Sequence, residues 1–338
     1  MKRTLSLLLT LLMMAGLIAI APVTAGAVVI GVNDADGLAL ALASAADGDT
    51  IKLTADIDYE DAIAFNGKSI TFDLNGKILN ATDGVHVGDG DLLLAKPIVG
   101  ALNVSRSDGD AGTTVEALRG KVEVSSVTDS VYSSWPLCAD GGEIMVYGDV
   151  AYTGTPGGTC TGAVVFNNGK ITIDGVFTVP AGAKYIAVEY VDKAPEDFET
   201  PSTKTGYIEY NATDGTDTST VWVKCSDHEW GAGWDKDAAG HKHSGVCALC
   251  GAADTAAVHT YGAWVVTLEP TAEDVGSRSR TCSVCGYVDT EAIPALGYEY
   301  VGGPFGFFKT KYVATQENWI KFYVFFGWIW MWFILPAA

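Results

Sequence analysis

Basic residues are scarce in this chain of 338 residues. Lysine and arginine total 21, against 41 aspartates and glutamates, and the formal net charge is −20 at pH 7. A chain of this charge repels nucleic acid and anionic lipid. We therefore expect no nucleic-acid partner. The acidity supports solubility and is compatible with weak cation binding, but it points to no specific site.

Long apolar runs are missing from the middle of the sequence and occur only towards its two ends. At the start, Lys2 and Arg3 precede an apolar stretch from Leu5 to Ile20, and small residues follow it. This pattern predicts a signal peptide over residues 1–26, and hence an exported protein. The alternative is an uncleaved N-terminal anchor, for which the apolar stretch is short.

Residues 27–224 are rich in short segments that alternate apolar and polar residues, as in Ile51-Lys-Leu53. Such alternation predicts strands with one buried face. Six segments share a glycine, one or two polar residues and then a β-branched residue or leucine. An average spacing of about 24 residues suits one coil of a parallel β-helix, whereas a β-sandwich of hairpins is the alternative. The first apolar positions of these segments are residues 51, 70, 92, 122, 144 and 171.

An alanine- and leucine-rich run precedes the first of these strands and predicts a short helix. Leu38 and Leu42 lie on one face of it, and Asp34 or Asp36 is a suitable N-cap. The helix is expected to end near Asp47-Gly48.

Residues 28–200, with this helix followed by Gly-Asp-Thr-Ile-Lys-Leu at 48–53, resemble the right-handed β-helix regions of large surface proteins of Gram-positive, Clostridia-type bacteria. The resemblance implies an all-β chain whose body is a right-handed parallel β-helix, displayed at the cell surface.

Two cysteines of this body, Cys138 and Cys160, are 22 positions apart, which is about one coil. Adjacent rungs are ~4.8 Å apart, within disulfide reach. We therefore predict a rung-to-rung disulfide, with two unpaired buried cysteines as the alternative.

Polysaccharide lyases and some glycosidases also use this coil, and they need clustered carboxylates. Asp83, Asp89 and Asp91 form one acidic group, but they lie in turns where aspartate is common for local reasons. Trp135 is the only tryptophan between residues 28 and 200, so aromatic subsites for sugars are lacking. We expect no enzyme; a lyase or glycosidase is the alternative function.

Two C-x-x-C-G knuckles follow the body, at Cys247–Gly251 and Cys282–Gly286. Each is preceded by a His-x-aromatic stretch, beginning at His228 and His259, and by a tryptophan. Zinc takes four Cys/His ligands in a closed tetrahedral site and supplies much of the folding free energy of a small unit. We predict a zinc-ribbon-like module over residues 225–297, with the tryptophans packed over the knuckles.

Three ligand sets remain open, of which the first two are preferred. In one, Cys225 and His228 complete the first knuckle. In another, His259 takes the place of Cys225, and in the third the two knuckles share a single metal. Short-loop disulfides are the alternative to metal in an oxidising compartment. The predicted ligands are Cys225, His228, Cys247, Cys250, His259, Cys282 and Cys285.

Residues 225–298 resemble the Cys/His repeats near the C-termini of the same surface proteins, which implies a structural module with no defined activity. The match includes His259, Arg280 and Ile293-Pro294. Tyr298 stands where the repeat usually has a histidine, so the second unit is expected to be degenerate and either to borrow a ligand or to bind no metal. The histidines His241 and His243 are expected to face solvent, with His243 as a reserve ligand.

The last segment is hydrophobic and aromatic, with Lys321 as an interruption. We predict a linker over residues 298–318 and a hydrophobic helix over residues 319–338 that anchors the protein in the membrane. An interfacial segment or a partner-docking strand is the alternative. Together these features predict a non-catalytic cell-surface protein for adhesion, for contact with an extracellular glycan or protein, or for a structural stalk.

Overall fold

The computed structural model divides into two compact units, Met1–His228 with Leu249–Gly251, and Glu229–Ala248 with Ala252–Ala338. The predicted signal peptide lies outside the described residues except for Gly26. The structure describes residues 26–107, 111–155, 160–300, 309–311, 319–326 and 329–336.

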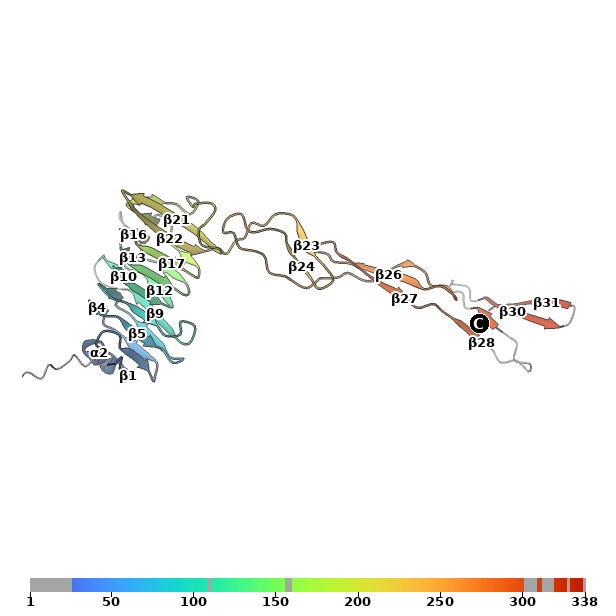
Figure 1. Cartoon of the computed structure of the whole chain (residues 1–338), viewed down its shortest axis with the longest axis horizontal. Helices are drawn as coiled ribbons and strands as arrows, with labels where there is room; N and C mark the ends of the chain where they lie inside the picture. Colours follow the sequence, from blue (N-terminus) through green and yellow to red (C-terminus); the bar gives the residue numbers. More distant parts are fainter. Residues whose placement is uncertain are drawn as a thin grey trace, which may run out of the picture. The chain divides into compact units, whose positions relative to one another are not determined.

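The first unit is a parallel β-solenoid of about seven turns (Figure 1). Successive strands of a turn enter three different sheets, so each sheet gains one strand per turn. The first sheet has the order β1 (Val29–Val32), β2 (Thr50–Leu53), β5 (Ile70–Asp73), β8 (Leu92–Leu94), β11 (Lys121–Val124), β14 (Glu143–Val146), β17 (Lys170–Ile173), β22 (Asp217–Lys224), β21 (Tyr207–Asp214).

The other two sheets complete each turn. The second has the order β20 (Val191–Lys193), β19 (Lys184–Val188), β16 (Thr161–Phe166), β13 (Trp135–Asp140), β10 (Thr113–Leu118), β7 (Val85–Val87), β4 (Ile63–Phe65). The third has the order β18 (Phe177–Thr178), β15 (Val150–Tyr152), β12 (Ser126–Asp129), β9 (Ala101–Arg106), β6 (Ile78–Ala81), β3 (Ile57–Tyr59). Only β19–β20 and β21–β22 pair antiparallel among the described strands of this unit.

Parallel pairing confirms the predicted β-helix and is incompatible with a sandwich of hairpins. The predicted opening positions of the coils stack in one column of the first sheet. Ile70 pairs with Leu92, Leu92 with Val122, Val122 with Ile144, and Ile144 with Ile171, and none of the five has any exposed surface. The solenoid core is therefore built from the repeat that the sequence displays.

The first turn departs from this column, because Ile51 pairs with Phe72 rather than with Ile70. It is also where the one helix among the described residues, α2 (Ala35–Ser44), is placed. The Asp34 carboxylate accepts a hydrogen bond from the Gly37 N–H at 2.7 Å, as predicted for an N-cap. Leu38 is fully buried, so the helix closes the core at this end of the solenoid.

The predicted disulfide between Cys138 and Cys160 is not formed in the structure. The register pairs Cys138 with Val164, so Cys160 lies four residues further back along the neighbouring strand. Each strand residue advances ~3.3 Å, which puts the two cysteines beyond disulfide reach. The coil is 26 residues long at this position, from Cys138 to Val164, so the separation of 22 residues falls four short and does not align the two cysteines. Burial raises the pKa of the Cys138 thiol to about 12.

The strands that the structure describes in the second unit all pair antiparallel in small sheets (Figure 1). Its first two sheets surround the predicted knuckles, and its last two fall in the predicted linker and anchor. The strands are β23 (Trp234–Lys236) with β24 (His241–His243), then β25 (Val265–Leu268), β26 (Gly276–Thr281) and β27 (Val288–Ile293), then β28 (Tyr298–Tyr300) with β29 (Lys309–Lys311), and β30 (Trp319–Phe326) with β31 (Ile329–Pro336).

The predicted C-terminal helix over residues 319–338 is not confirmed. Its described residues form β30 and β31, which pair antiparallel from Trp319–Pro336 to Phe326–Ile329. Alternating bulky and β-branched residues suit a strand as well as an apolar helix. The remaining residues of this segment and most of the predicted linker lie outside the described residues. Among the residues that the structure describes, no helix has the length and apolar character needed to span a membrane.

Candidate metal centres

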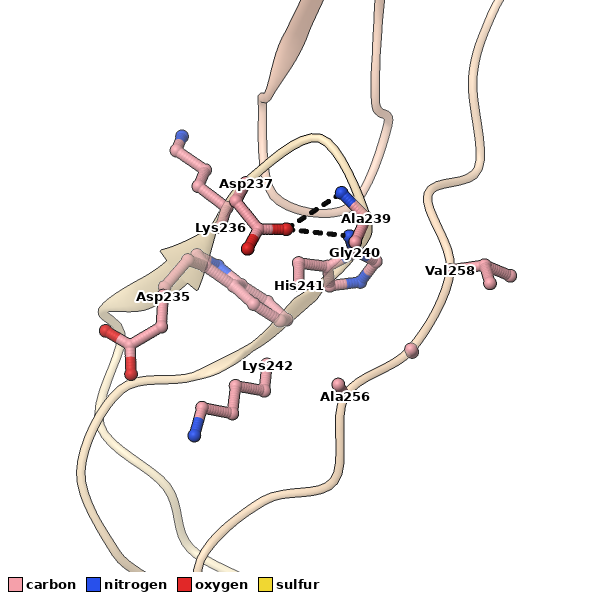
Figure 2. Close-up of a pocket in the computed structure, with 11 residues that line it drawn as sticks. Asp235, Lys236, Asp237, Ala239, Gly240, His241, Lys242, Ala256 and Val258 are labelled. Atoms are coloured by element: carbon pink, nitrogen blue, oxygen red, sulfur yellow. Dashed lines mark hydrogen bonds between the residues drawn. The ribbon is translucent and has the colours of Figure 1, made fainter.

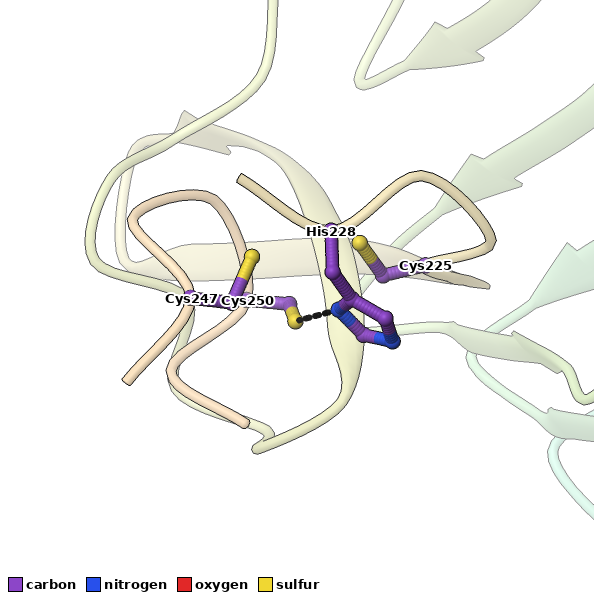
Figure 3. Close-up of side chains that lie close together, drawn as sticks. All are labelled: Cys225, His228, Cys247 and Cys250. Carbon is purple, nitrogen blue, oxygen red and sulfur yellow. Dashed lines mark hydrogen bonds between the residues drawn. The ribbon is translucent and has the colours of Figure 1, made fainter. Parts of the chain in front are cut away.

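Two groups of four cysteine and histidine side chains each bring their ligand atoms within 4.8 Å of one another, and each could hold a metal ion. Centre 1 consists of Cys225, His228, Cys247 and Cys250 (Figure 3). Centre 2 consists of His241, His259, Cys282 and Cys285.

Centre 1 begins where the solenoid ends, because Cys225 directly follows β22. The Cys225 N–H donates to the Gly206 carbonyl at 3.0 Å, and the Gly206 N–H donates to the Cys250 carbonyl at 2.9 Å. Gly206 directly precedes β21, so these bonds fix Cys225 and Cys250 to the final hairpin of the solenoid. The thiol of Cys250 lies 3.3 Å from Nδ1 of His228 (Figure 3).

The two knuckles have the same backbone conformation. Gly251 and Gly286, which follow the second cysteine of each, both have φ +68°. This left-handed conformation suits glycine, as the C-x-x-C-G pattern predicts. Backbone N–H groups are also placed near sulfur: the Glu229 N–H donates to Sγ of Cys247 at 3.3 Å. Such bonds stabilise a thiolate, the form in which cysteine binds metal.

The histidine side chains of centre 2 direct Nδ1 atoms towards one another and towards a cysteine sulfur, as ligands of a metal ion would be. Nε2 of His259 lies 2.7 Å from the Asp237 carbonyl oxygen, so Nε2 carries the hydrogen and Nδ1 keeps its lone pair. Nδ1 of His259 is 3.3 Å from Nδ1 of His241 and 3.4 Å from Sγ of Cys285. Donor atoms that converge in this way repel one another unless a cation or proton lies among them, so the side chains present fit a metal ion.

The charges at centre 2 favour a thiolate. Burial opposes ionisation of Cys282, but the N–H groups of Cys285 and Val284 and the His259 side chain together lower its pKa to about 6. The Asp237 carbonyl raises the pKa of His259, with a further contribution from Cys282. A metal ion would replace the proton in this arrangement.

Aromatic rings, rather than aliphatic side chains, hold the imidazoles of centre 2. The His259 ring stacks on Tyr287, with centroids 4.7 Å apart and planes at 12°, and it also contacts Tyr261 at 5.2 Å. Trp234 meets the His241 ring edge-on at 5.1 Å. The Trp264 ring contacts the guanidinium groups of Arg278 and Arg280, at 4.8 and 4.5 Å from its centroid.

The first of the three predicted ligand sets is the one that the structure assembles at the first knuckle. The knuckles do not share a metal site, and His259 belongs to centre 2. The expectation that His241 faces solvent is wrong, because its exposed fraction is 6% and it completes centre 2. The expected reserve ligand, His243, instead bonds through Nδ1 to Asp254 at 2.8 Å.

The second Cys/His unit supplies only three of the donors of centre 2, His259, Cys282 and Cys285, and borrows the fourth, His241, from the preceding unit. Sequence reasoning missed His241 because its place depends on hairpin β23–β24, which pairs it with Lys236. One signal was available: four of the five histidines follow residue 224. Histidine gathered beside knuckle cysteines favours ligation over solvent exposure.

A hollow of about 660 Å³ lies beside centre 2, between hairpin β23–β24 and residues 256–258 (Figure 2). The Asp237 carboxylate points to the hairpin turn, where it accepts hydrogen bonds from the N–H groups of Ala239 at 2.8 Å and Gly240 at 3.2 Å. His241 lines the hollow as well, so the hollow belongs to the surroundings of centre 2.

Two of the carboxylates weighed for catalysis, Asp89 and Asp91, have structural partners. Asp89 forms an ion pair with Arg119 at 3.0 Å. Asp91 accepts hydrogen bonds from the Lys121 N–H at 2.8 Å and from the Ser69 hydroxyl at 3.1 Å. These contacts join neighbouring turns of the solenoid. No protein-family model, curated protein or solved structure matches this chain.

Proposed function

We propose that this chain is a non-catalytic, exported cell-surface protein in which residues 225–297 form a zinc-stabilised structural module. One observation supports the proposal of a metal-stabilised module. Of the residues from 229 to 297, only seven are buried, and five of these are ligands of the two centres. The other two are Ala272 and Gly276. A unit without an apolar core requires another source of stability, which a structural metal supplies.

Zinc suits the donors on chemical grounds. It is redox-inert, accepts mixed sulfur and nitrogen ligands, and favours the tetrahedral geometry that four side chains offer. Centre 1 presents three cysteines and one histidine, and centre 2 two of each. Structural zinc provides ~10–16 kcal/mol of apparent binding free energy in small zinc-finger peptides at pH 7, which is ample for a unit of this size.

Two features support a non-catalytic role. A catalytic zinc keeps a position open for water or substrate, whereas both centres have four protein ligands. The solenoid carboxylates Asp89 and Asp91 are engaged in bonds between turns, so we favour the alternative of a lyase or glycosidase less. The export leader and the hydrophobic tail support a surface location, where the solenoid would contact a glycan or protein or act as a stalk.

Metal analysis of the full chain, purified under reducing conditions, tests the module. We expect two zinc ions per chain. The double variant C247S/C250S should retain one, and C138A, which removes a thiol from the solenoid, should retain two. A chain with no zinc and with oxidised knuckle cysteines would overturn the proposal in favour of disulfides.

The location is tested separately by cell fractionation. The full chain should sediment with membranes, and deletion of residues 319–338 should release it into the medium. Continued association of the deleted form with cells would contradict a C-terminal anchor.

A further inference from the structure

The chain between two ligands of centre 1 carries a ligand of centre 2. His228 and Cys247 bound a loop of residues 229–246, which contains the hairpin β23–β24. His241 is the first residue of β24. The loop whose ends meet at centre 1 therefore delivers one of the four donors of the other centre.

The two ends of this loop are joined at centre 1 itself. The Glu229 N–H donates to Sγ of Cys247 at 3.3 Å, and the Ala248 N–H donates to the Glu229 carbonyl at 3.0 Å. A metal that binds His228 and Cys247 together closes the loop covalently at this point. Loop closure costs conformational entropy, and the metal at centre 1 would supply the free energy for it.

Inside the loop, backbone pairing determines where His241 points. His241 pairs with Lys236 across the hairpin and forms two backbone hydrogen bonds with Ala257, at 2.9 and 2.8 Å. Lys236 in turn donates to the Cys285 carbonyl at 2.7 Å. The hairpin thus reaches centre 2 through a ligand on one strand and a hydrogen bond on the other, and any disorder of the hairpin removes both.

We propose that His241 couples the two centres, so that metal binding at centre 1 raises the affinity of centre 2 for metal. The inference rests on the proposed function, because it requires both centres to bind metal. When centre 1 has already ordered the hairpin, metal binding at centre 2 no longer has to offset the conformational entropy lost on ordering it. Coupling is reciprocal, so a filled centre 2 raises the affinity of centre 1 by the same factor, typically 5- to 150-fold.

The same arrangement orders the filling of the sites. Centre 1 has three thiolates and is fixed to the solenoid through Gly206, which already has its own core. Centre 2 lies among residues with almost no buried apolar surface and depends on the hairpin for its fourth donor. Centre 1 therefore fills first.

Native mass spectrometry of the full chain at sub-stoichiometric zinc gives the direct test. The affinity of each centre, measured with the other disabled in C225S or H241A, gives the singly loaded fraction expected for independent centres, and positive coupling lowers the observed wild-type fraction below it. Cobalt substitution identifies the centre that fills first, since charge-transfer absorption scales with the number of Co–S bonds, three at centre 1 and two at centre 2.

Variants separate the coupling from simple loss of a site. In C225S, centre 2 should bind zinc about 5- to 150-fold more weakly in chelator competition, although its own four ligands are intact. H241A should lose the metal of centre 2, H241C should retain it, and H243F should bind two ions as wild type does. His243 is the matched control because it lies on the same strand and keeps an aromatic ring there.

The outcomes are distinct. A singly loaded fraction equal to that of independent centres, or an affinity of centre 2 in C225S equal to that in the wild type, would overturn the coupling and leave the zinc module standing. Absence of bound metal would overturn the module itself. An unchanged far-UV circular dichroism spectrum of the solenoid shows that C225S has not simply unfolded.

Discussion

Single residues decide which cysteines of this chain are suited to metal. Cys138 and Cys282 are both almost fully buried, yet their pKa values move in opposite directions, to about 12 and about 6. Cys138 alternates with the core residues Leu137 and Ala139 along β13, and desolvation, together with the carboxylates of Glu116 and Asp140, disfavours its thiolate. Cys282 faces backbone N–H groups and a histidine, which favour it despite burial. Burial alone therefore does not distinguish a ligand from a core residue.

The depressed pKa of Cys282 predicts acid lability of centre 2. A group whose pKa is lower in the folded state contributes stability above its unfolded value, and this stability is lost as pH falls through the folded value, here about 6. Protonation also displaces metal. We expect zinc release and a change in tryptophan fluorescence between pH 7 and 5. The C138A variant should follow the same profile, because Cys138 stays protonated throughout; a profile flat to pH 5 would contradict the assignment.

The buried carboxylate of Asp129 is predicted to contribute strongly to the stability of the solenoid. Asp129 has no exposed surface and accepts hydrogen bonds from the Thr114 and Ser134 hydroxyls, both at 2.7 Å, and from the Val131 N–H at 2.8 Å. D129A removes the acceptor that these buried donors share, although the Ser134 hydroxyl keeps the Val131 carbonyl at 3.1 Å, and should cost ~3 kcal/mol of unfolding free energy in urea titration.

D58A is the control for Asp129. Asp58 is exposed and accepts one hydrogen bond from Asn80 at 2.7 Å. Its loss should cost less than ~1 kcal/mol. Equal losses for the two variants would show that burial of Asp129 contributes nothing beyond the bonds themselves.

Among the elements, the sheet β25–β27 replaces an apolar core with stacked cations. The Arg280 guanidinium lies between Tyr261 and Trp264, 4.1 and 4.5 Å from their ring centroids. Its Nε donates to Oδ2 of Asp289 at 2.9 Å, and Nη2 forms an ion pair with the same oxygen at 2.8 Å. Apolar residues such as Val265 and Leu268 on the same sheet are exposed. In this sheet the stacked guanidinium group of arginine thus takes the place that packed aliphatic side chains such as leucine have in the solenoid.

Lysine at position 280 should therefore destabilise this sheet. Lysine retains the charge, but it lacks the planar group that stacks on the two rings and brings two nitrogens to Oδ2 of Asp289, and we expect a loss of ~1–2 kcal/mol. Tryptophan fluorescence during thermal unfolding reports it. R278K is the matched control, since Arg278 contacts one ring, that of Trp264 at 4.8 Å, and should cost less. A larger effect at Arg278 would contradict the account.

For the whole molecule, stability is divided between an apolar solenoid and a metal-dependent module. A chelator should therefore expose residues 229–297 to protease and create new cleavage sites there, while the body up to Lys224 keeps its protection. Mass analysis of the fragments checks this. Chelator saturated with zinc beforehand is the control, and primary cleavage within the solenoid would contradict the division.

The solenoid could be predicted from the sequence more fully than the metal-dependent module. Repeating Gly–polar–apolar segments predict both the coil and the register from Ile70 to Ile171, because core burial requires each coil to align with the next. Centre 1 was predictable because its ligands occur in two short motifs. His241 was not, since only hairpin pairing brings it to centre 2, and the strands at β30 and β31 replaced a helix because apolar aromatic runs suit both.

Centre 2 draws His241 from upstream and the rest of its donors from residues 259–285, just as centre 1 draws Cys225 from upstream of its knuckle. During synthesis, which runs from the N-terminus, each site is completed at the moment its own second knuckle cysteine emerges. No half-built site has to wait for a distant downstream donor, so reactive thiolates are exposed only briefly before metal can enclose them.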